Sequence, residues 1–265
     1  MARPVPRERG NWAVVLGASS GFGAAISRAL ARTGMNICGV HLDRRNTTPL
    51  AEAVAADVQS AGVEALFFNV NAADPAKRQE VVSALKERGA LVHVLMHSLA
   101  FGSLRRYIEH DPANEVSQKQ MDMTLDVMAN SLVYWTQDLY HAGLFGADAR
   151  IFAMTGEGSS RVFAGNGAVS AAKAALESHI RQLAVELALS RISANAIQGG
   201  VTNTPAQSKI PGGDEILEDA LSRNPAGRLT TPEDVARVIC VLSEPGIGWL
   251  TGNVIRVDGG ESLVP

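Results

Sequence analysis

Apolar residues recur along this chain in two alternating patterns. Short, continuous apolar runs such as residues 12–16 are typical of buried strands, whereas longer segments such as residues 24–33 space their apolar positions as a helix does. Gly34 follows that helical segment and is a typical helix end. The repeated alternation predicts strands at 12–16, 37–41, 64–70, 91–97, 150–154, 193–197 and 253–257, and helices at 24–33, 49–61, 75–88, 121–141, 168–189 and 232–242.

Strands that are apolar on both faces and separated by helices are typical of a parallel sheet with helices on each side. We therefore expect an α/β fold: a doubly wound, parallel, seven-stranded sheet of the Rossmann type, in a single domain spanning residues 1–265. Residues 202–223 interrupt the pattern, because they are rich in proline, glycine and polar residues. We expect them to form a flexible segment over a substrate site rather than part of the sheet or core.

Composition narrows the class of protein. Of the 265 residues, 46% are hydrophobic and 19% charged, which provides enough apolar material for one large core. The net charge of −3 argues against nucleic-acid binding, and no apolar run reaches the roughly 18 residues of a membrane-spanning helix. The six histidines are scattered, and Cys38 and Cys240 lie far apart. We expect a cytoplasmic protein with reduced thiols, no metal site, and no nucleic-acid or membrane partner.

A glycine-rich turn joins the first predicted strand to the first predicted helix. Gly17 allows a tight turn, Gly21 lets the backbone approach a pyrophosphate, and Gly23 allows the strand and helix to pack closely. The free N–H groups of the helix N-terminus attract phosphate. Glycine triplets are common, but the strand–turn–helix setting predicts dinucleotide binding. The expected contacts are Gly17, Ser19, Ser20, Gly21, Phe22 and Gly23.

The residues after the second predicted strand bear on the choice of dinucleotide. NAD sites place a carboxylate here to bind the ribose hydroxyls, whereas the 2′-phosphate of NADP favours arginine. His41 occupies the position expected for that carboxylate, and Arg44 and Arg45 follow it. We therefore expect NADPH, bound through Arg44 and Arg45. Asp43 leaves NADH as the less favoured alternative, and the alternative for the two arginines is a solvated turn.

Two more predicted strands end in residues suited to the rest of the cofactor. Asn71 and Ala72 follow the third strand and are expected to contact the adenine. His97, Ser98 and Leu99 end the fourth strand and are expected to line the nicotinamide ribose. The carboxyl ends of parallel strands meet at one edge of a sheet, so all these contacts fall at the same edge. We interpret His97 first as a structural residue, with a proton donor as the alternative.

The glycine loop, Lys173 on its predicted helix, and the sequence Val257-Asp-Gly-Gly260 together resemble the short-chain dehydrogenase/reductase superfamily over essentially the whole chain. Within that superfamily, residues 96–101, 195–204 and 217–228 are similar to the enoyl-[acyl-carrier-protein] reductases that prefer NADPH. The resemblance implies the fold, a nucleotide site and a reductase activity. We expect further cofactor contacts in the loop after the sixth strand, at Gly199, Val201, Thr202 and Thr204.

This chain departs from the superfamily pattern at the catalytic tyrosine. Ordinary members carry that tyrosine four residues before the lysine and enoyl reductases carry it seven before, where this chain has Val169 and Asn166. The usual position of the catalytic serine holds Gly156. The three tyrosines of the chain lie elsewhere, at Tyr107, Tyr134 and Tyr140. The departure leaves cofactor binding unaffected and puts the proton transfer in question.

Enoyl reduction moves hydride to the β-carbon and needs a hydrogen bond to the enolate oxygen that develops. We expect Lys173 to hold the nicotinamide ribose and Asn166 to donate its amide N–H to that oxygen, while water protonates the α-carbon. Loss of one oxyanion donor costs roughly 10²–10³ in rate, so slow turnover is expected. Glu157 is either a substitute acid or an exposed loop carboxylate.

We therefore predict an enzyme with an atypical, tyrosine-less site that uses NADPH to reduce the C=C bond of an enoyl thioester. A ketone needs its oxygen protonated as hydride arrives, so the loss of tyrosine is expected to harm a ketoreductase more. The alternatives are an atypical ketoreductase of secondary metabolism and a non-catalytic nucleotide-binding relative.

Partners follow from surface charge and from the resemblance. Arg105, Arg106 and Lys209 near the expected mouth suit an acidic acyl carrier protein or a coenzyme A phosphate, or else are solvated surface. Superfamily members commonly pair two long helices in dimers or tetramers. We expect the helices at 121–141 and 168–189 to do so here.

Overall fold

Every strand of the described chain lies in one parallel sheet. The computed structural model describes residues 11–210 and 212–264, and within them the strand order is β3-β2-β1-β4-β5-β6-β7. This confirms the predicted doubly wound, seven-stranded Rossmann-type fold. The strands are β1 (Asn11–Leu16), β2 (Asn36–His41), β3 (Ala65–Asn69), β4 (Leu91–His97), β5 (Phe145–Thr155), β6 (Ser193–Gly199) and β7 (Val254–Val257).

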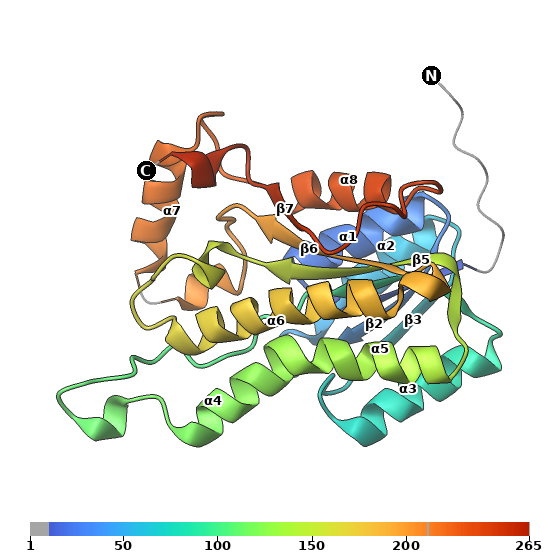
Figure 1. The fold of residues 1–265 in the computed structure, drawn as a ribbon, viewed down its shortest axis with the longest axis horizontal. Helices are drawn as coiled ribbons and strands as arrows, with labels where there is room; N and C mark the ends of the chain where they lie inside the picture. The colour runs from blue at the N-terminus through green and yellow to red at the C-terminus, as the bar shows by residue number, and fades with distance from the viewer. Residues whose placement is uncertain (1–10, 211, 265) are drawn as a thin grey trace.

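Helices cover both faces of the sheet (Figure 1). One face packs against α3, α5 and α6 through an apolar cluster that includes Trp135 and Leu176, and the other against α1, α2 and α8 through a cluster that includes Ile26 and Ile239. No helix in the described part has the length and apolarity to cross a membrane. The helices are α1 (Gly21–Arg32), α2 (Thr48–Ser60), α3 (Pro75–Glu87), α4 (Gln118–Leu125), α5 (Ser131–His141), α6 (Gly167–Glu186), α7 (Gly213–Arg223) and α8 (Pro232–Leu242).

The helix predicted at 121–141 is longer and less regular than expected. It begins three residues earlier, because Ser117 and Gln120 form a capping box at the start of α4. Between α4 and α5, residues Asp126–Asn130 are π-helical. Short π-helical stretches of this kind are frequent near functional sites. Val127, within this stretch, lines a cleft described below.

Residues 202–223 contain α7, a helix that the sequence did not predict. Asp214 and Glu215 lie in its first turn, where acidic side chains favour a helix N-terminus, and Ala220 is fully buried. The helical pattern of α7 is short and follows prolines and glycines, so it was not recognised in the sequence. The segment is therefore partly helical and contributes to the core, contrary to expectation.

The strand order reverses between β1 and β4. The chain leaves β1 toward β2 and β3 and then returns to β4, which lies on the other side of β1. The loops at the carboxyl ends of β1 and β4 therefore run in opposite directions and leave a crevice between them. The glycine loop follows β1 and Ser98 follows β4, so the fold brings these predicted cofactor residues to the crevice.

Candidate functional site

The glycine loop after β1 has no room for larger side chains. Gly17 has a positive φ of 87°, and a Cβ built there would lie 2.3 Å from the carbonyl oxygen of Ser98. A Cβ at Gly23 would lie 2.1 Å from the carbonyl oxygen of Gly17. These contacts explain two of the three glycines: the loop passes directly against the end of β4 and against the start of α1.

The N-terminus of α1 is free to receive an anion. Ser20 stands at its N-cap in an extended conformation and makes no side-chain capping hydrogen bond. The first turn of α1 contains no acidic residue. Its backbone N–H groups, with the positive end of the helix dipole, therefore suit a phosphate group.

A cleft of about 290 Å³ runs along this edge of the sheet, between the loops that follow β1, β2, β3 and β4. Asp43, Ala100 and Thr204 are among its walls. Gly23 supports the loop from behind, through its contact with Gly17. The predicted cofactor residues that line this cleft are Gly17, Ser19, Ser20, Gly21, Phe22, Asn71, Ala72, Ser98, Leu99 and Thr204.

Asp43 is the charged residue at the β2 end of this cleft. Its Oδ2 lies 2.8 Å from Nδ1 of His41, and its backbone N–H donates to Oδ1 of Asn69 at 2.9 Å. Burial opposes ionisation, but hydrogen bonds from Ser19, Thr47 and His41 outweigh it and lower the pKa of Asp43. The carboxylate therefore stays charged and already accepts several hydrogen bonds.

Arg44 and Arg45, which the sequence assigned to the 2′-phosphate, are exposed on the turn after Asp43 and do not line the cleft. Within residues 11–210 and 212–264, no acidic side chain pairs with either guanidinium. Both groups are available at the margin of the cleft, and their contact with a cofactor stays a prediction.

A second cleft of about 370 Å³ adjoins the first and shares Phe22, Phe101 and Thr204 with it. Asn166 and Val169, from the first turn of α6, lie on its wall. Its apolar lining includes Leu104, Met128, Phe163, Ile210 and Ile216, the last from α7. Gly199, Val201 and Thr202 line this cleft rather than the first. The shared wall places a ligand in one cleft next to a ligand in the other.

Neither cleft has a tyrosine among the described residues of its lining. The ring of Tyr107 packs against Gly167, on the surface of α6 that carries Ser170 and Ala171. Asn166 and Val169, from the same turn of this helix, line the second cleft. A site that works without a phenol therefore stays a prediction.

Lys173 connects α6 to the ends of two strands. Its Nζ donates to the carbonyl oxygens of Met154 at 2.7 Å and Leu99 at 3.5 Å. Burial lowers the pKa of Lys173 to about 8, although the nearby carboxylate of Glu177 favours the charged form. Glu177 also accepts a 2.6 Å hydrogen bond from the hydroxyl of Thr155. The ammonium thus lies beside Leu99, where the cofactor cleft ends.

Asn166 is the N-cap residue of α6 and lines the second cleft. Its Nδ2 donates to Oγ of Ser170 at 3.3 Å, which is a long hydrogen bond for an amide. The side chain makes no capping bond to the helix. The amide is therefore weakly held and has a second N–H for a ligand.

His97 lies behind the cleft wall rather than in it. Its side chain is fully buried, and its Nε2 lies 2.9 Å from Oγ of Ser131, which in turn donates to the carbonyl oxygen of Val127. Burial and the charge of Lys173 lower the pKa of His97 to about 3. The ring is neutral near pH 7, which favours the structural interpretation over the proton donor. The predicted contact of this side chain with the cofactor lacks support from its position.

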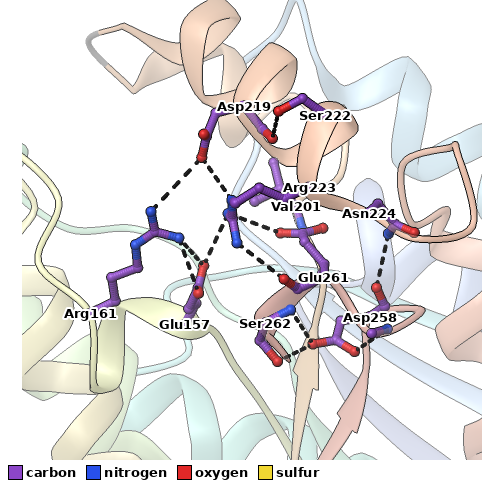
Figure 2. A network of polar contacts seen from close by, with 12 residues as sticks. Glu157, Arg161, Val201, Asp219, Ser222, Arg223, Asn224, Asp258, Glu261 and Ser262 are labelled. Carbon is purple, nitrogen blue, oxygen red and sulfur yellow. Dashed lines mark hydrogen bonds and ion pairs between the residues drawn. The ribbon is translucent and has the colours of Figure 1, made fainter. Parts of the chain in front are cut away.

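A charged network that sequence inspection missed closes the far wall of the second cleft (Figure 2). Arg223 of α7 lies 3.0 Å from Asp219, 3.6 Å from Glu157 and 3.8 Å from the carboxylate of Glu261. Arg161 lies 3.3 Å from Glu157 on the other side. Glu157 is thus an ion-paired wall residue, neither of the two options expected. The residues of this network come from segments far apart in the chain, so no local sequence pattern predicts their ion pairs.

The basic residues assigned to a carrier protein are engaged locally. Arg105 donates to the carbonyl oxygen of Ala113 at 2.9 Å, and Arg106 lies 3.5 Å from Glu109. The side chain of Lys209 falls outside the described residues. Across the described ranges, no group of three His, Cys, Asp or Glu side chains is placed to hold a metal ion.

Comparison with known proteins identifies the family to which this chain belongs. Residues 17–262 match the family model described as Enoyl-(Acyl carrier protein) reductase. A cis-4-hydroxycyclohexanecarboxylate dehydrogenase of Sinomonas cyclohexanicum is 31% identical, over 95% of this chain and 96% of its own. A 1-cyclohexenylcarbonyl-CoA reductase of Streptomyces collinus is 28% identical, over 97% and 89%.

Among solved structures, an enoyl-(acyl-carrier-protein) reductase of Anaplasma phagocytophilum in complex with NAD superposes with a TM-score of 0.83 at 22% identity, over 100% of this chain and 96% of that one. That likeness shows the shared fold. The relatives similar in sequence are oxidoreductases, and the family match spans both clefts. The chain therefore belongs to the Enoyl-(Acyl carrier protein) reductase family of short-chain dehydrogenases/reductases.

Proposed function

We propose that this protein uses NADPH to reduce the C=C bond of an enoyl thioester at a site without a catalytic tyrosine. The observation that carries the proposal is the pair of adjoining clefts, with Lys173 beside the first and Asn166 on the wall of the second. The named activity of the Streptomyces relative, on a cyclohexenylcarbonyl thioester, supports this substrate class.

The first cleft fits a nicotinamide dinucleotide. The glycine loop and the α1 N-terminus would hold the pyrophosphate, and Asn71 and Ala72 the adenine. Ser98, Leu99 and the ammonium of Lys173 would hold the nicotinamide ribose. When bound, the reduced nicotinamide supplies hydride. Gly199, Val201, Thr202 and Thr204 would close the junction of the two clefts around it.

The preference for NADPH rests on the turn after β2. Asp43 already accepts hydrogen bonds from Ser19, Thr47 and His41, which leaves it little capacity for ribose hydroxyls. Arg44 and Arg45 follow it with exposed, unpaired guanidinium groups in the described chain. Two arginines beside one occupied carboxylate give this turn a net positive charge, which suits a 2′-phosphate.

At the reacting end, the described residues offer hydrogen-bond donors but no phenol. Asn166 would donate its amide N–H to the oxygen on which negative charge develops. The carboxyl oxygens of Glu157 are engaged in ion pairs with Arg161 and Arg223. An enolate can take its proton from water after hydride transfer, whereas a ketone oxygen must be protonated as hydride arrives. The residues present therefore favour reduction of C=C over C=O.

A ketoreductase or alcohol dehydrogenase is the second candidate. The relative with 31% identity is named for the oxidation of a hydroxycyclohexane ring, so its substrate is an alcohol. The apolar lining of the second cleft suits a ring as well as an acyl chain. This candidate needs an acid to protonate the ketone oxygen, and the described lining of the cleft includes no tyrosine for that role.

Assembly and partners are further parts of the proposal. The exposed apolar residues Tyr140 of α5 and Val185 of α6 suit pairing of these helices in a dimer or tetramer. An acyl carrier protein or coenzyme A would deliver the substrate past Phe101, which is exposed at the cleft. The two free cysteines suit the reducing cytoplasm.

The proposal is tested by mixing the purified protein with NADPH and each of three acceptors: crotonyl-CoA, 2-cyclohexenone and cyclohexanone. We expect slow oxidation of NADPH with the two conjugated alkenes and little with the ketone. Faster oxidation with cyclohexanone would establish the ketoreductase instead. Binding of NADPH without turnover of any acceptor would establish a non-catalytic relative.

A further inference from the structure

Gln198 is the last polar side chain of β6, and the mechanism above does not use it. The residue is 6% exposed, yet it lines the second cleft. Across residues 11–210 and 212–264, its carboxamide has no hydrogen-bond partner. The oxygen and the nitrogen of the carboxamide are both partly accessible, so the amide reaches the space of the cleft.

Its neighbours in the sheet explain why no protein group satisfies it. Gln198 pairs in register with Thr155 of β5 on one side and with Arg256 of β7 on the other. The hydroxyl of Thr155 is committed to Glu177 at 2.6 Å, and Arg256 is exposed. The adjacent glycines, Gly199 and Gly200, bring no side chain to it.

The side chain faces α6, the helix that carries Asn166 and Lys173. Ala194 and Ala196 of β6 belong to the apolar cluster on the α6 face, and Ile197 belongs to the cluster on the opposite face. Since side chains alternate along a strand, Gln198 lies on the α6 face, as Thr155 does. Gln198 and Asn166 therefore approach the same cleft from the end of a strand and the start of a helix.

A carboxamide that has no protein partner but reaches a cleft can hydrogen-bond a ligand there in place of water. We propose that Gln198 is a specificity-determining residue whose carboxamide hydrogen-bonds an oxygen atom of the substrate in the second cleft. It rests on the proposed function, because it requires that a carbonyl-bearing substrate enters this cleft. A carboxamide offers both N–H donors and an acceptor oxygen, so the residue selects substrates that present a carbonyl or hydroxyl there.

The test compares Gln198→Met with the wild-type protein. Methionine has nearly the same length but neither donor nor acceptor. We expect KM for the best acceptor among crotonyl-CoA, 2-cyclohexenone and cyclohexanone to rise about five- to tenfold, the effect of one hydrogen bond, while the Kd for NADPH stays the same. We also expect Tm to stay nearly equal, because the carboxamide makes no hydrogen bond to the described protein that the variant would lose. A purely structural glutamine would give a lower Tm instead.

Gln59→Met is the matched control, because Gln59 is exposed on α2 away from both clefts. It should change neither KM nor Kd. Gln198→Glu keeps the shape, loses the N–H donors and adds a negative charge beside a cleft that already contains Glu157 and Glu261, so it should bind the acceptor more weakly than Gln198→Met.

Unchanged KM in Gln198→Met, or a loss of Tm with unchanged KM, would overturn the role of Gln198 while leaving the proposed function in place. A wild-type protein that binds NADPH and reduces none of the three acceptors would overturn the proposed function, and this inference with it.

Discussion

The backbone N–H of Val201 lies 3.2 Å from Oε2 of Glu261, a residue that is only 2% exposed. This contact ties the loop after β6 to the turn after β7, and Arg223 adds α7 through its 3.2 Å hydrogen bond to the carbonyl oxygen of Glu261. Burial raises the pKa of Glu261, although the Val201 N–H and Arg223 favour its charged form. Glu261 therefore connects the loop after β6, the turn after β7 and α7 beside the second cleft.

Gly200 has no room for a side chain in this arrangement. A Cβ there would lie 2.3 Å from Oγ1 of Thr230 and 2.9 Å from Oε2 of Glu261. We expect Gly200→Ala to lower the free energy of unfolding by about 1–3 kcal/mol, as other overpacked sites do, and to weaken acceptor binding. Urea unfolding measures the first effect. Gly156→Ala is the control, because a Cβ at Gly156 meets nothing within 4 Å; equal losses in both variants would contradict the explanation.

Asn166→Tyr restores a phenol at the position where enoyl reductases carry one. We expect kcat for crotonyl-CoA to rise by roughly 10–100-fold, because a phenol is a better oxyanion donor than an amide, with the Kd for NADPH unchanged. Steady-state kinetics and fluorescence titration measure the two quantities. Asn166→Phe supplies the ring without the hydroxyl and should give no gain. If Asn166→Tyr abolished a robust native activity, the position would serve substrate shape instead.

We expect Lys173 to make the activity dependent on pH. Its pKa of about 8 means that the folded protein loses this charge as pH rises through 8, so kcat/KM should fall above that value. Stability should change in the opposite direction. The unfolded chain holds this proton up to about 10.4, so between these values this group adds stability as pH rises. Lys173→Ala should weaken NADPH binding and remove the fall of kcat/KM above pH 8. Unchanged kinetics in this variant would contradict the role of Lys173 in holding the nicotinamide ribose.

His97 should contribute to acid unfolding. Its pKa falls from 6.5 to about 3 in the folded chain, so the unfolded chain binds the extra proton over that interval. Stability therefore decreases as pH falls below 6.5, by up to about 1.4 kcal/mol per pH unit from this residue. Urea unfolding at pH 4–7 and NMR titration of the ring measure the effect. A ring that titrates near pH 6.5 in the folded protein would contradict the observed burial.

Arg44 and Arg45 decide the cofactor preference if the proposal is correct. We expect Arg44→Ala combined with Arg45→Ala to weaken NADPH binding roughly tenfold or more and to leave NADH unchanged, because only NADPH carries the 2′-phosphate. Titration calorimetry with both nucleotides measures this. Arg181→Ala, an exposed arginine on α6, is the control. Tighter binding of NADH than NADPH by the wild-type protein would assign the selection to Asp43.

Local patterns were enough to predict most of the fold. Each strand and its following helix are specified by residues close together in sequence, such as 12–16 before the glycine turn. These predictions are confirmed within a few residues, except that the strand predicted at 150–154 begins five residues earlier, as β5 (Phe145–Thr155). The helix α7 was missed because it begins with a glycine, Gly213, directly after the N-cap Gly212, and because Arg223 is buried by its charged partners rather than by apolar content. The glycine loop was predictable since its spacing directly reflects the turn it makes.

The parallel sheet, the glycine-rich turn after β1 and the lack of tyrosine at positions 166 and 169 could be inferred from the amino-acid sequence, because these features depend on short-range spacing. Three further properties became visible in the folded chain: Glu157 is ion-paired, His97 is buried and neutral near pH 7, and Gln198 faces a cleft without a protein partner among the described residues. Those properties depend on what surrounds a side chain, and here the surroundings come from segments such as α7 and the turn after β7. Their contacts with the site form only when the chain has folded.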